Sequence, residues 1–391
     1  MRNIFFIGLV SFFIDISTEM VYPLIPLYLA TFGAAPMLVG IIEGIAESTA
    51  SLLKVYSGYL TDKSQKKKQI AFWGYSAGIF YKIALIFASS WVGILAARVV
   101  DRIGKGFRTA PRDVLVSESI DKENIGKAFG FHKALDAAGG AIGMLLTFFI
   151  ITSLDGNYDF KTIFALSIIP GILGLCMFFF IKEKKIERPV KVRTAFWKDV
   201  GKIDNQLKLY LFVVFIFMIG NSSAAFQLLK AKDVGFSDVN IILLYFVSKS
   251  VAAVLSMPFG KLSDKIGRKN LLVPGYLAFS LCYFGFAFAS SHTEMITTFV
   301  LFGIYTAMIT GVERAFVAEI APPALKGTML GLHSTISGIA LLPASIIAGA
   351  LWMAFGAQIP FIFGASLSLI AAIILIIFMK SGKPNSVLSV N

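Results

Sequence analysis

The stretches Gly58-Tyr-Leu-Thr-Asp62-Lys-Ser-Gln-Lys-Lys67 and Gly260-Lys-Leu-Ser-Asp264-Lys-Ile-Gly-Arg-Lys269 match each other at an offset of 202 residues. A second match, at an offset of 201 residues, pairs Glu118, Gly126, Gly130 and His132 with Glu319, Gly327, Gly331 and His333. Two separate matches at nearly one offset indicate an internal duplication. The sequence therefore predicts two similar halves that run in the same direction.

The composition is that of a membrane protein. Hydrophobic residues make up 57% of the 391, charged residues only 15%, and the mean hydropathy is +0.77. A hydrocarbon core of roughly 30 Å needs a helix of about 20 residues. Twelve runs are long enough, and we place them at 4–31, 37–61, 70–89, 91–116, 125–152, 160–182, 206–230, 238–261, 270–290, 295–320, 327–354 and 358–380.

The basic residues predict the orientation of these helices. They gather after the second, sixth, eighth, tenth and twelfth runs, as in Lys66-Lys-Lys68 and Arg268-Lys269, whereas the loops after the first, third and eleventh runs have none. Cytoplasmic loops carry the excess of Lys and Arg, so we expect both termini in the cytoplasm and the protein in the plasma (inner) membrane. The formal net charge of +13 thus reflects orientation in a lipid bilayer and does not indicate a nucleic-acid partner.

The longest polar stretch divides the chain. Residues 183–205 carry Pro189 and charges of both signs near the middle of the sequence. We therefore expect an N-terminal six-helix bundle at 1–182, a cytoplasmic linker at 183–205 and a C-terminal six-helix bundle at 206–391.

With these features the whole chain resembles the major facilitator superfamily of transporters. Gly58-x-x-x-Asp62-Lys and Gly260-x-x-x-Asp264-Lys-x-Gly-Arg-Lys are similar to that family's signature loop and to its second copy, although Gln65 stands where a Gly is usual. The resemblance implies an all-α fold of twelve transmembrane helices in two pseudo-symmetric bundles. It also implies a cytoplasmic gate in which Arg112 and Arg314 are the expected partners of Asp62 and Asp264. The residues that we assign to this gate are Gly58, Asp62, Arg112, Asp113, Gly260, Asp264, Arg268 and Arg314.

Two glycine patterns extend the resemblance. Arg98, followed by Gly104 and Gly106, resembles a family motif associated with proton coupling. The spacing Gly130-(x)8-Gly139-(x)3-Gly143 is similar to the glycine pattern of the family's antiporters, with Met144 in place of the expected Pro. The alternative for this second pattern is close packing of helices.

Ionisable residues inside the predicted membrane helices point to a functional site, because unpaired charges there are costly. Two acids lie one turn apart in each of the first two helices, and arginines with an acid follow in the fourth. A carboxyl group that competes for an arginine can bind either a proton or a cation. We assign substrate or proton coupling to Asp15, Glu19, Glu43, Glu47, Arg98, Asp101, Arg102, Asn221 and Gln227, with a structural salt-bridge lattice as the alternative.

The sequence favours a secondary transporter that works by alternating access. We expect proton-coupled export of drug-like or metabolite compounds, that is, an antiporter. Uptake of an organic anion is the alternative, and a non-transporting receptor is an alternative of another class. We expect a monomer, no enzymatic activity and no cofactor or metal, since neither a nucleophile–base constellation nor a ligand spacing is present.

Overall fold

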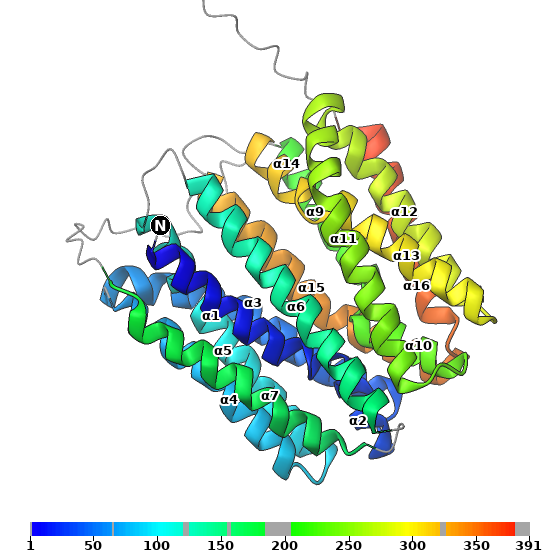
Figure 1. Ribbon diagram of the computed structural model, residues 1–391. Coiled ribbons are helices and arrows are strands. Elements are labelled where there is room, and N and C mark those ends of the chain that lie inside the picture. Colours follow the sequence, from blue (N-terminus) through cyan, green and yellow to red (C-terminus); the bar gives the residue numbers. More distant parts are fainter. Residues whose placement is uncertain are drawn as a thin grey trace, which may run out of the picture. The chain divides into compact units, whose positions relative to one another are not determined.

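The computed structural model describes residues 2–64, 66–119, 125–154, 158–183, 205–320 and 326–379 (Figure 1). At 55, 58, 59, 62–64, 117, 125–130, 318 and 326–328 it describes the backbone only. Almost all of the predicted linker and the side chain of Asp62 therefore lie outside the described residues. Within them all regular structure is helical, which confirms the predicted all-α fold.

The chain divides into two units: residues 1–192 with 236–246, and residues 193–235 with 247–391. The helices of the first unit are α1 (Arg2–Glu19), η1 (Tyr22–Leu24), α2 (Ile25–Thr31), α3 (Pro36–Ser64), α4 (Lys67–Phe87), α5 (Trp91–Glu118), α6 (Ile125–Ser153), α7 (Phe160–Met177) and η3 (Phe178–Phe180). The second unit contains α9 (Asn205–Gly220), α10 (Ala224–Asp233), most of α11 (Asp238–Ile266), α12 (Arg268–Phe288), α13 (His292–Ile309), α14 (Val312–Ile320), α15 (Lys326–Phe355) and α16 (Ile359–Phe378).

Eleven segments of the described chain are long and apolar enough to cross a membrane. They coincide with the predicted runs except for 91–116, where α5 forms a helix of 28 residues whose charges lower its hydropathy. With α5 included, the helices account for twelve crossings.

Three of the predicted helices are interrupted. The run 4–31 breaks between Glu19 and Ile25, where Pro23 has no N–H to donate to the carbonyl one turn earlier. The run 206–230 breaks at 221–223, where Ser223 caps α10 by accepting a hydrogen bond from the N–H of Ala225. The run 295–320 breaks at 310–311, a segment that contains Gly311, because glycine disfavours a helix interior.

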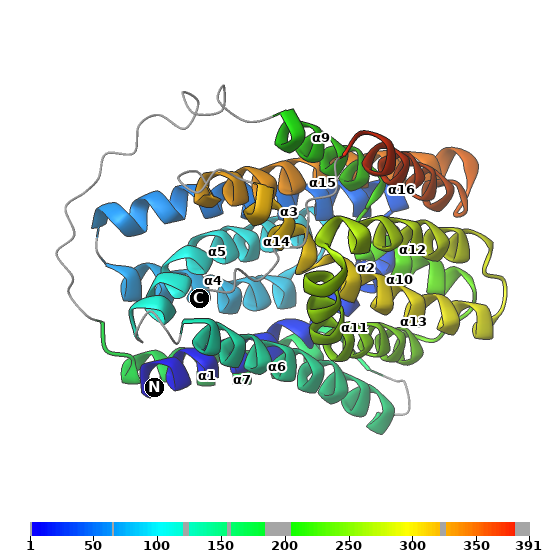
Figure 2. The same cartoon turned by 90° about the horizontal axis from the view of Figure 1, so that it is seen from above.

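The two units repeat the same packing order. In the first, α1 packs on α6 and α7, and α4 packs on α5 and α7. In the second, α9 packs on α15 and α16, and α12 packs on α13 and α16. Figure 2 shows α5 between α3 and α4 within the first unit. The predicted pseudo-symmetry of two bundles is thus present in the fold.

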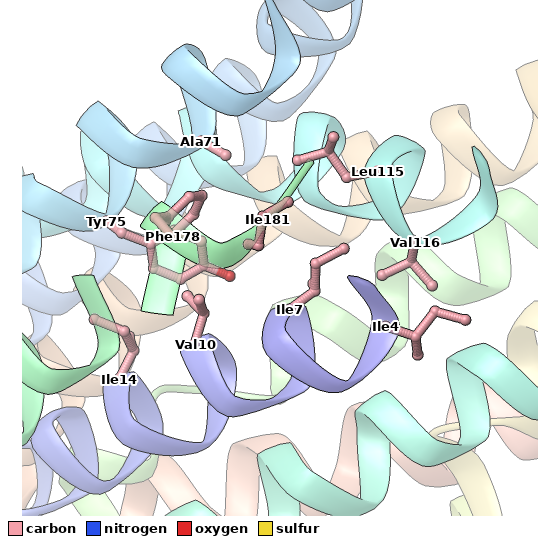
Figure 3. Close-up of a cluster of buried hydrophobic side chains, with 10 residues drawn as sticks. All are labelled: Ile4, Ile7, Val10, Ile14, Ala71, Tyr75, Leu115, Val116, Phe178 and Ile181. Atoms are coloured by element: carbon pink, nitrogen blue, oxygen red, sulfur yellow. The ribbon is translucent and has the colours of Figure 1, made fainter. Parts of the chain in front are cut away.

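An apolar cluster fixes one end of the first unit (Figure 3). Ile4, Ile7, Val10 and Ile14 follow one another at helical spacing, so they form one face of α1. This face contacts α4, α5 and η3, where the ring of Tyr75 lies 5.4 Å from that of Phe178. The position of α1 relative to α4 and α5 is therefore set by apolar contacts, beside the charged residues described next.

Candidate functional site

Ion pairs join α3 and α5 in the interior of the first unit. Nη2 of Arg98 lies 2.6 Å from each carboxylate oxygen of Glu43, and both side chains are almost completely buried. One turn further along both helices, Nη1 of Arg102 lies 2.9 Å from Oε1 of Glu47. We call Glu43, Glu47, Arg98, Asp101 and Arg102 the arginine–carboxylate cluster.

Asp101 connects the two ion pairs of this cluster. Its Oδ2 lies 3.8 Å from Nη1 of Arg98 and 3.5 Å from Nε of Arg102. Each arginine therefore faces two carboxylates, one on α3 and one on its own helix. The outer edge of the cluster is Glu47, whose side chain is 23% exposed and whose Oε2 lies 3.9 Å from Nζ of Lys105.

Glycines allow α5 to approach its neighbours closely enough for these pairs. A Cβ added to Gly104 would lie 2.5 Å from the carbonyl oxygen of Gly74 in α4. A Cβ added to Gly106 would lie 2.6 Å from Cβ of Leu53 in α3. Both distances are below any real contact, so the helix backbones meet where these residues lack side chains. The glycines that follow Arg98 therefore have a packing role.

The interruption of the first helix adds an aromatic residue that the sequence analysis missed. Tyr22, in η1, presents its ring to both guanidinium groups, with Cζ of Arg98 at 5.4 Å and Cζ of Arg102 at 5.9 Å from the ring centre. Such cation–π contacts stabilise a desolvated arginine. The nearby Pro23 was the signal that could have indicated this position.

The other two predicted acids lie on α1. Asp15 and Glu19 are half-buried. A Cβ added to Gly140 in α6 would lie 3.5 Å from Cγ of Glu19. Among the four acids, the structure thus pairs Glu43 and Glu47 directly with the arginines of α5 and places Glu19 beside α6.

Two further buried cations of the first unit were not among the predicted site residues. Lys82 of α4 is 2% exposed, and its Nζ donates a hydrogen bond to the carbonyl oxygen of Gly78 at 3.1 Å. Cζ of Arg108 lies 4.9 Å from the ring centre of Tyr75. A lone lysine within the apolar run 70–89 was the sequence signal for the first of them.

The predicted gate residues of the second unit pair differently from the expectation. Asp264 forms its ion pair with Arg268, at 3.5 Å, and not with the exposed Arg314, as far as the described side chains go. Arg268 reaches across to α14, where it binds Oε2 of Glu319 and the carbonyl oxygen of Ala315, each at 2.9 Å. Arg268 is the first residue of α12, directly after the loop, and its side chain can therefore contact both Asp264 of α11 and the residues of α14. A Cβ added to Gly260 would meet no atom within 4 Å.

The first unit has an equivalent contact. Nζ of Lys67, at the start of α4, lies 2.8 Å from Oε2 of Glu118, at the end of α5. Glu118 and Glu319 are repeat-equivalent, so each unit joins the start of one helix to the end of the next through this acid. We call Lys67–Glu118 and Arg268–Glu319 the repeat ion pairs. Arg112, by contrast, bonds to the adjacent Asp113, with Nη2 at 2.8 Å from Oδ1.

The glycine pattern of α6 lies against α1. A Cβ on Gly139 would lie 2.3 Å from the carbonyl oxygen of Phe12, and one on Gly143 would lie 2.4 Å from that of Ile16. Both glycines therefore serve close helix packing. Gly130 has no described side-chain environment.

The two predicted polar residues of the second unit lie at the break between α9 and α10. Oδ1 of Asn221 lies 3.5 Å from the hydroxyl of Tyr283, and Gln227 is 2% exposed. They form a polar patch within an otherwise apolar and aromatic region of that unit.

The chain is similar to known transporters along nearly its whole length. The model of the Major Facilitator Superfamily matches residues 7–249 and 210–390. An uncharacterized MFS-type transporter of Methanocaldococcus jannaschii is 34% identical over 381 residues, covering 96% of this chain and 94% of that protein. The multidrug resistance protein MdtH of Klebsiella pneumoniae is 21% identical over 338 residues, covering 85% and 82%.

Solved structures share the fold at low sequence identity. A crystal structure of the nucleoside transporter NupG has a TM-score of 0.80 at 11% identity, covering 96% of this chain and 99% of that one. A peptide transporter, POT, has a TM-score of 0.78 at 13% identity, covering 96% and 94%. The residues matched by the family model include the repeat, the arginine–carboxylate cluster and the repeat ion pairs. This chain is a multi-pass membrane protein that belongs to the major facilitator superfamily, and hence a secondary transporter.

Proposed function

We propose that this transporter exports small organic compounds, drug-like or metabolic, in exchange for protons. The observation that carries the proposal is the arginine–carboxylate cluster, in which three carboxylates compete for two arginines inside a membrane-spanning bundle. Charges at this depth are retained when they have a function. A proton that neutralises one carboxylate frees an arginine to change partner.

Glu47 is the member of this cluster best placed to exchange a proton. Its side chain is 23% exposed, whereas that of Glu43 is 2% exposed. Protonation of Glu47 would remove its attraction for Arg102, which would then turn fully to Asp101 at 3.5 Å. Glu19, the last residue of α1, is the second candidate because it adjoins the break that brings Tyr22 over the arginines.

The direction of transport is inferred from two weaker features. The distant relative MdtH is a multidrug resistance protein, which supports export of organic compounds. The glycine pattern of α6 resembles that of antiporters, although its packing against α1 explains Gly139 and Gly143 equally well.

The repeat ion pairs are our candidates for the cytoplasmic gate. We infer that both termini and the linker at 183–205 are cytoplasmic, in the plasma membrane, and that a monomer suffices. Lys67–Glu118 and Arg268–Glu319 would then lie at the cytoplasmic ends of their helices. Their formation would favour the outward-open state and their breakage the inward-open state.

Uptake of an organic anion is the second candidate function. Lys82 and Arg108 add two buried cations to the same unit, and the hydrogen bond of Lys82 among the described residues goes to a backbone carbonyl. Such a site attracts a carboxylate or phosphate group. A substrate of this class would be transported together with protons.

Transport by purified protein in sealed proteoliposomes tests the proposal. An imposed pH gradient should drive movement of cationic dyes or other drug-like compounds, and proton movement should follow their addition. Accumulation of organic anions instead would favour the second candidate. Glu47→Gln and Glu19→Gln should abolish coupling in folded protein, while Glu294→Gln, at an exposed acid of α13, should leave it intact. Unchanged coupling in both of the first two variants would refute the assignment, and no transport with any compound would favour a receptor.

A further inference from the structure

A second buried acid lies in the C-terminal unit, apart from the arginine–carboxylate cluster. Glu313 is in the first turn of α14 and is 9% exposed. The hydroxyl of Tyr276, in α12, donates a hydrogen bond to its Oε1 at 3.0 Å. Nε2 of His333, in α15, lies 3.7 Å from its Oε2. We call these three residues, which come from three helices, the Glu313 triad.

Aromatic side chains surround the Glu313 triad. The ring of Tyr210 is parallel to that of His333, with centres 6.4 Å apart, and the ring of Phe217 is stacked on Tyr276 at 4.2 Å. Tyr210, Phe217 and Tyr276 are at most 1% exposed. A charge in such surroundings has lost its hydration and depends on its immediate partners.

The ionisable groups around Glu313 allow the triad to bind one proton. The imidazole of His333 lies 3.7 Å from its Oε2, and the adjacent Arg314 is exposed, as far as the described residues extend. Nε2 of His333 has no hydrogen-bond partner among those residues. With a neutral imidazole the triad carries one negative charge, and one added proton makes it neutral.

Two physical effects on Glu313 oppose each other. Burial favours the protonated acid, because an unhydrated carboxylate is costly. The first turn of α14 and the hydroxyl of Tyr276 favour the carboxylate, since both direct positive charge toward it. Glu313 can therefore be populated both as the protonated acid and as the carboxylate.

We propose that the Glu313 triad is a proton-binding site of the C-terminal unit, in which Glu313 and His333 share one proton. The inference deepens the proposed proton coupling and rests on it for its role in transport. A proton from water binds Oε2 of Glu313, and a side-chain rotation that shortens the 3.7 Å separation lets the resulting O–H donate a hydrogen bond to Nε2 of His333. Release returns the same proton to water, so the charge of the triad alternates between one negative charge and none.

The repeat distinguishes this site from its counterpart in the first unit. At the offset of 201 residues Tyr276 and His333 correspond to Tyr75 and His132, but Glu313 corresponds to Arg112. Nε2 of His132 is occupied by a hydrogen bond with Oγ of Ser11 at 2.8 Å. In the first unit the acid beside the histidine is Asp136 of the same helix, with Oδ1 3.6 Å from Nδ1 of His132. Among the described residues, an acid from a separate helix that meets both the histidine and the tyrosine hydroxyl is therefore particular to the second unit, which argues against a merely inherited packing contact.

The site is also placed to act on the helix that contains it. Glu313 follows the interruption at 310–311 by two residues, and its partners lie on the neighbouring helices α12 and α15. A change in its charge alters how α14 is held by both neighbours, while α13 remains a separate helix. Proton binding would thereby be linked to movement of α14.

Infrared difference spectroscopy of the purified, full-length protein between acidic and alkaline buffer, without substrate, tests the site directly. We expect the carbonyl stretch of a protonated carboxylic acid, its loss in Glu313→Gln, and its retention in the matched control Glu294→Gln. Glu294 forms a capping box that Gln can maintain. Tyr276→Phe removes one hydrogen bond to the carboxylate, so the band should persist to higher pH, corresponding to about a tenfold gain in proton affinity.

An unchanged band in Glu313→Gln, or its equal loss in Glu294→Gln, would overturn the proposal. If Glu313→Gln does not fold, the Tyr276→Phe titration decides: a shift supports the site and no shift overturns it. Proteoliposome assays separate this result from the proposed function. If the Glu313→Gln protein keeps the infrared band and its proton-coupled transport is unaltered, the site alone is refuted. If the wild type shows the Glu313 band but no coupled transport, the proposed function alone is refuted.

Discussion

The guanidinium group of Arg98 places Nη2 2.6 Å from both carboxylate oxygens of Glu43, and neither side chain is more than 2% exposed. The neighbouring pair, Arg102 with Glu47, has the same chemistry but a more exposed acid. Because burial differs, we expect the two acids to have different roles: Glu43 holds the bundle together and Glu47 exchanges protons.

The first prediction is that Glu43→Gln destabilises the protein. The substitution leaves Arg98 buried with a weaker partner, and breaking a buried ion pair costs about 3–5 kcal/mol. Reversible unfolding in mixed detergent micelles measures the change in free energy. Glu47→Gln should cost much less, since water reaches its side chain. Equal losses in the two variants would show that their roles are not separate.

The second prediction concerns the approach of α5 to α4. In Gly104→Ala the new methyl group would lie 2.5 Å from the carbonyl oxygen of Gly74, so one of the two backbones must move. We expect a loss of about 1–3 kcal/mol of stability, as for other overpacked positions, together with reduced transport. Gly331→Ala in α15 is the matched control, because its methyl group would enter open space. A Gly104→Ala protein with the stability of the control would contradict the close approach.

The sequence predicted the helices and their duplication because both depend on regular features. Apolar runs of sufficient length can only be membrane helices, and the two signature loops lie at one offset. It did not predict the breaks at 20–24, 221–223 and 310–311, because a break costs little in hydropathy and each broken helix still spans as one segment. Tyr22 was missed for the same reason, since only the break turns its ring toward Arg98 and Arg102.

The sequence predicted which residues form the candidate site, but it did not predict which of them pair with each other. Helical spacing correctly brought Glu43 and Glu47 to the level of Arg98 and Arg102. Spacing along single helices says nothing of how neighbouring helices are rotated, so the approach of Glu19 to Gly140 of α6 could not be predicted. In the gate, Arg314 was the expected partner of Asp264, yet Arg268 lies one turn away on the path to Glu319.

A third prediction tests the aromatic contact. Tyr22→Phe keeps a ring over the two guanidinium groups, whereas Tyr22→Leu removes it. A desolvated cation–π contact contributes about 2 kcal/mol, so the leucine variant should lose stability of this order and the phenylalanine variant should not. Unfolding in mixed micelles compares the three proteins. If Tyr22→Phe were as unstable as Tyr22→Leu, the hydroxyl group and not the ring would be the stabilising feature.

The last prediction compares the repeat ion pairs. Lys67 and Glu118 are 6% and 7% exposed, whereas Arg268 and Glu319 are 28% and 36% exposed. Lys67→Met leaves a buried carboxylate without its cation and should cost about 3–5 kcal/mol. Arg268→Met removes a solvated pair and should cost no more than about 1 kcal/mol.

A double-mutant cycle measures the coupling within each pair. The single variants Lys67→Glu and Glu118→Lys should each lose stability, and the double variant should recover part of that loss, since it restores opposite charges at the same positions. The corresponding variants of Arg268 and Glu319 form the matched cycle in the other unit, and unfolding measurements give both coupling energies. Equal coupling energies in the two cycles would mean that burial does not set the strength of these contacts, and that the two units contribute equally to holding the gate closed.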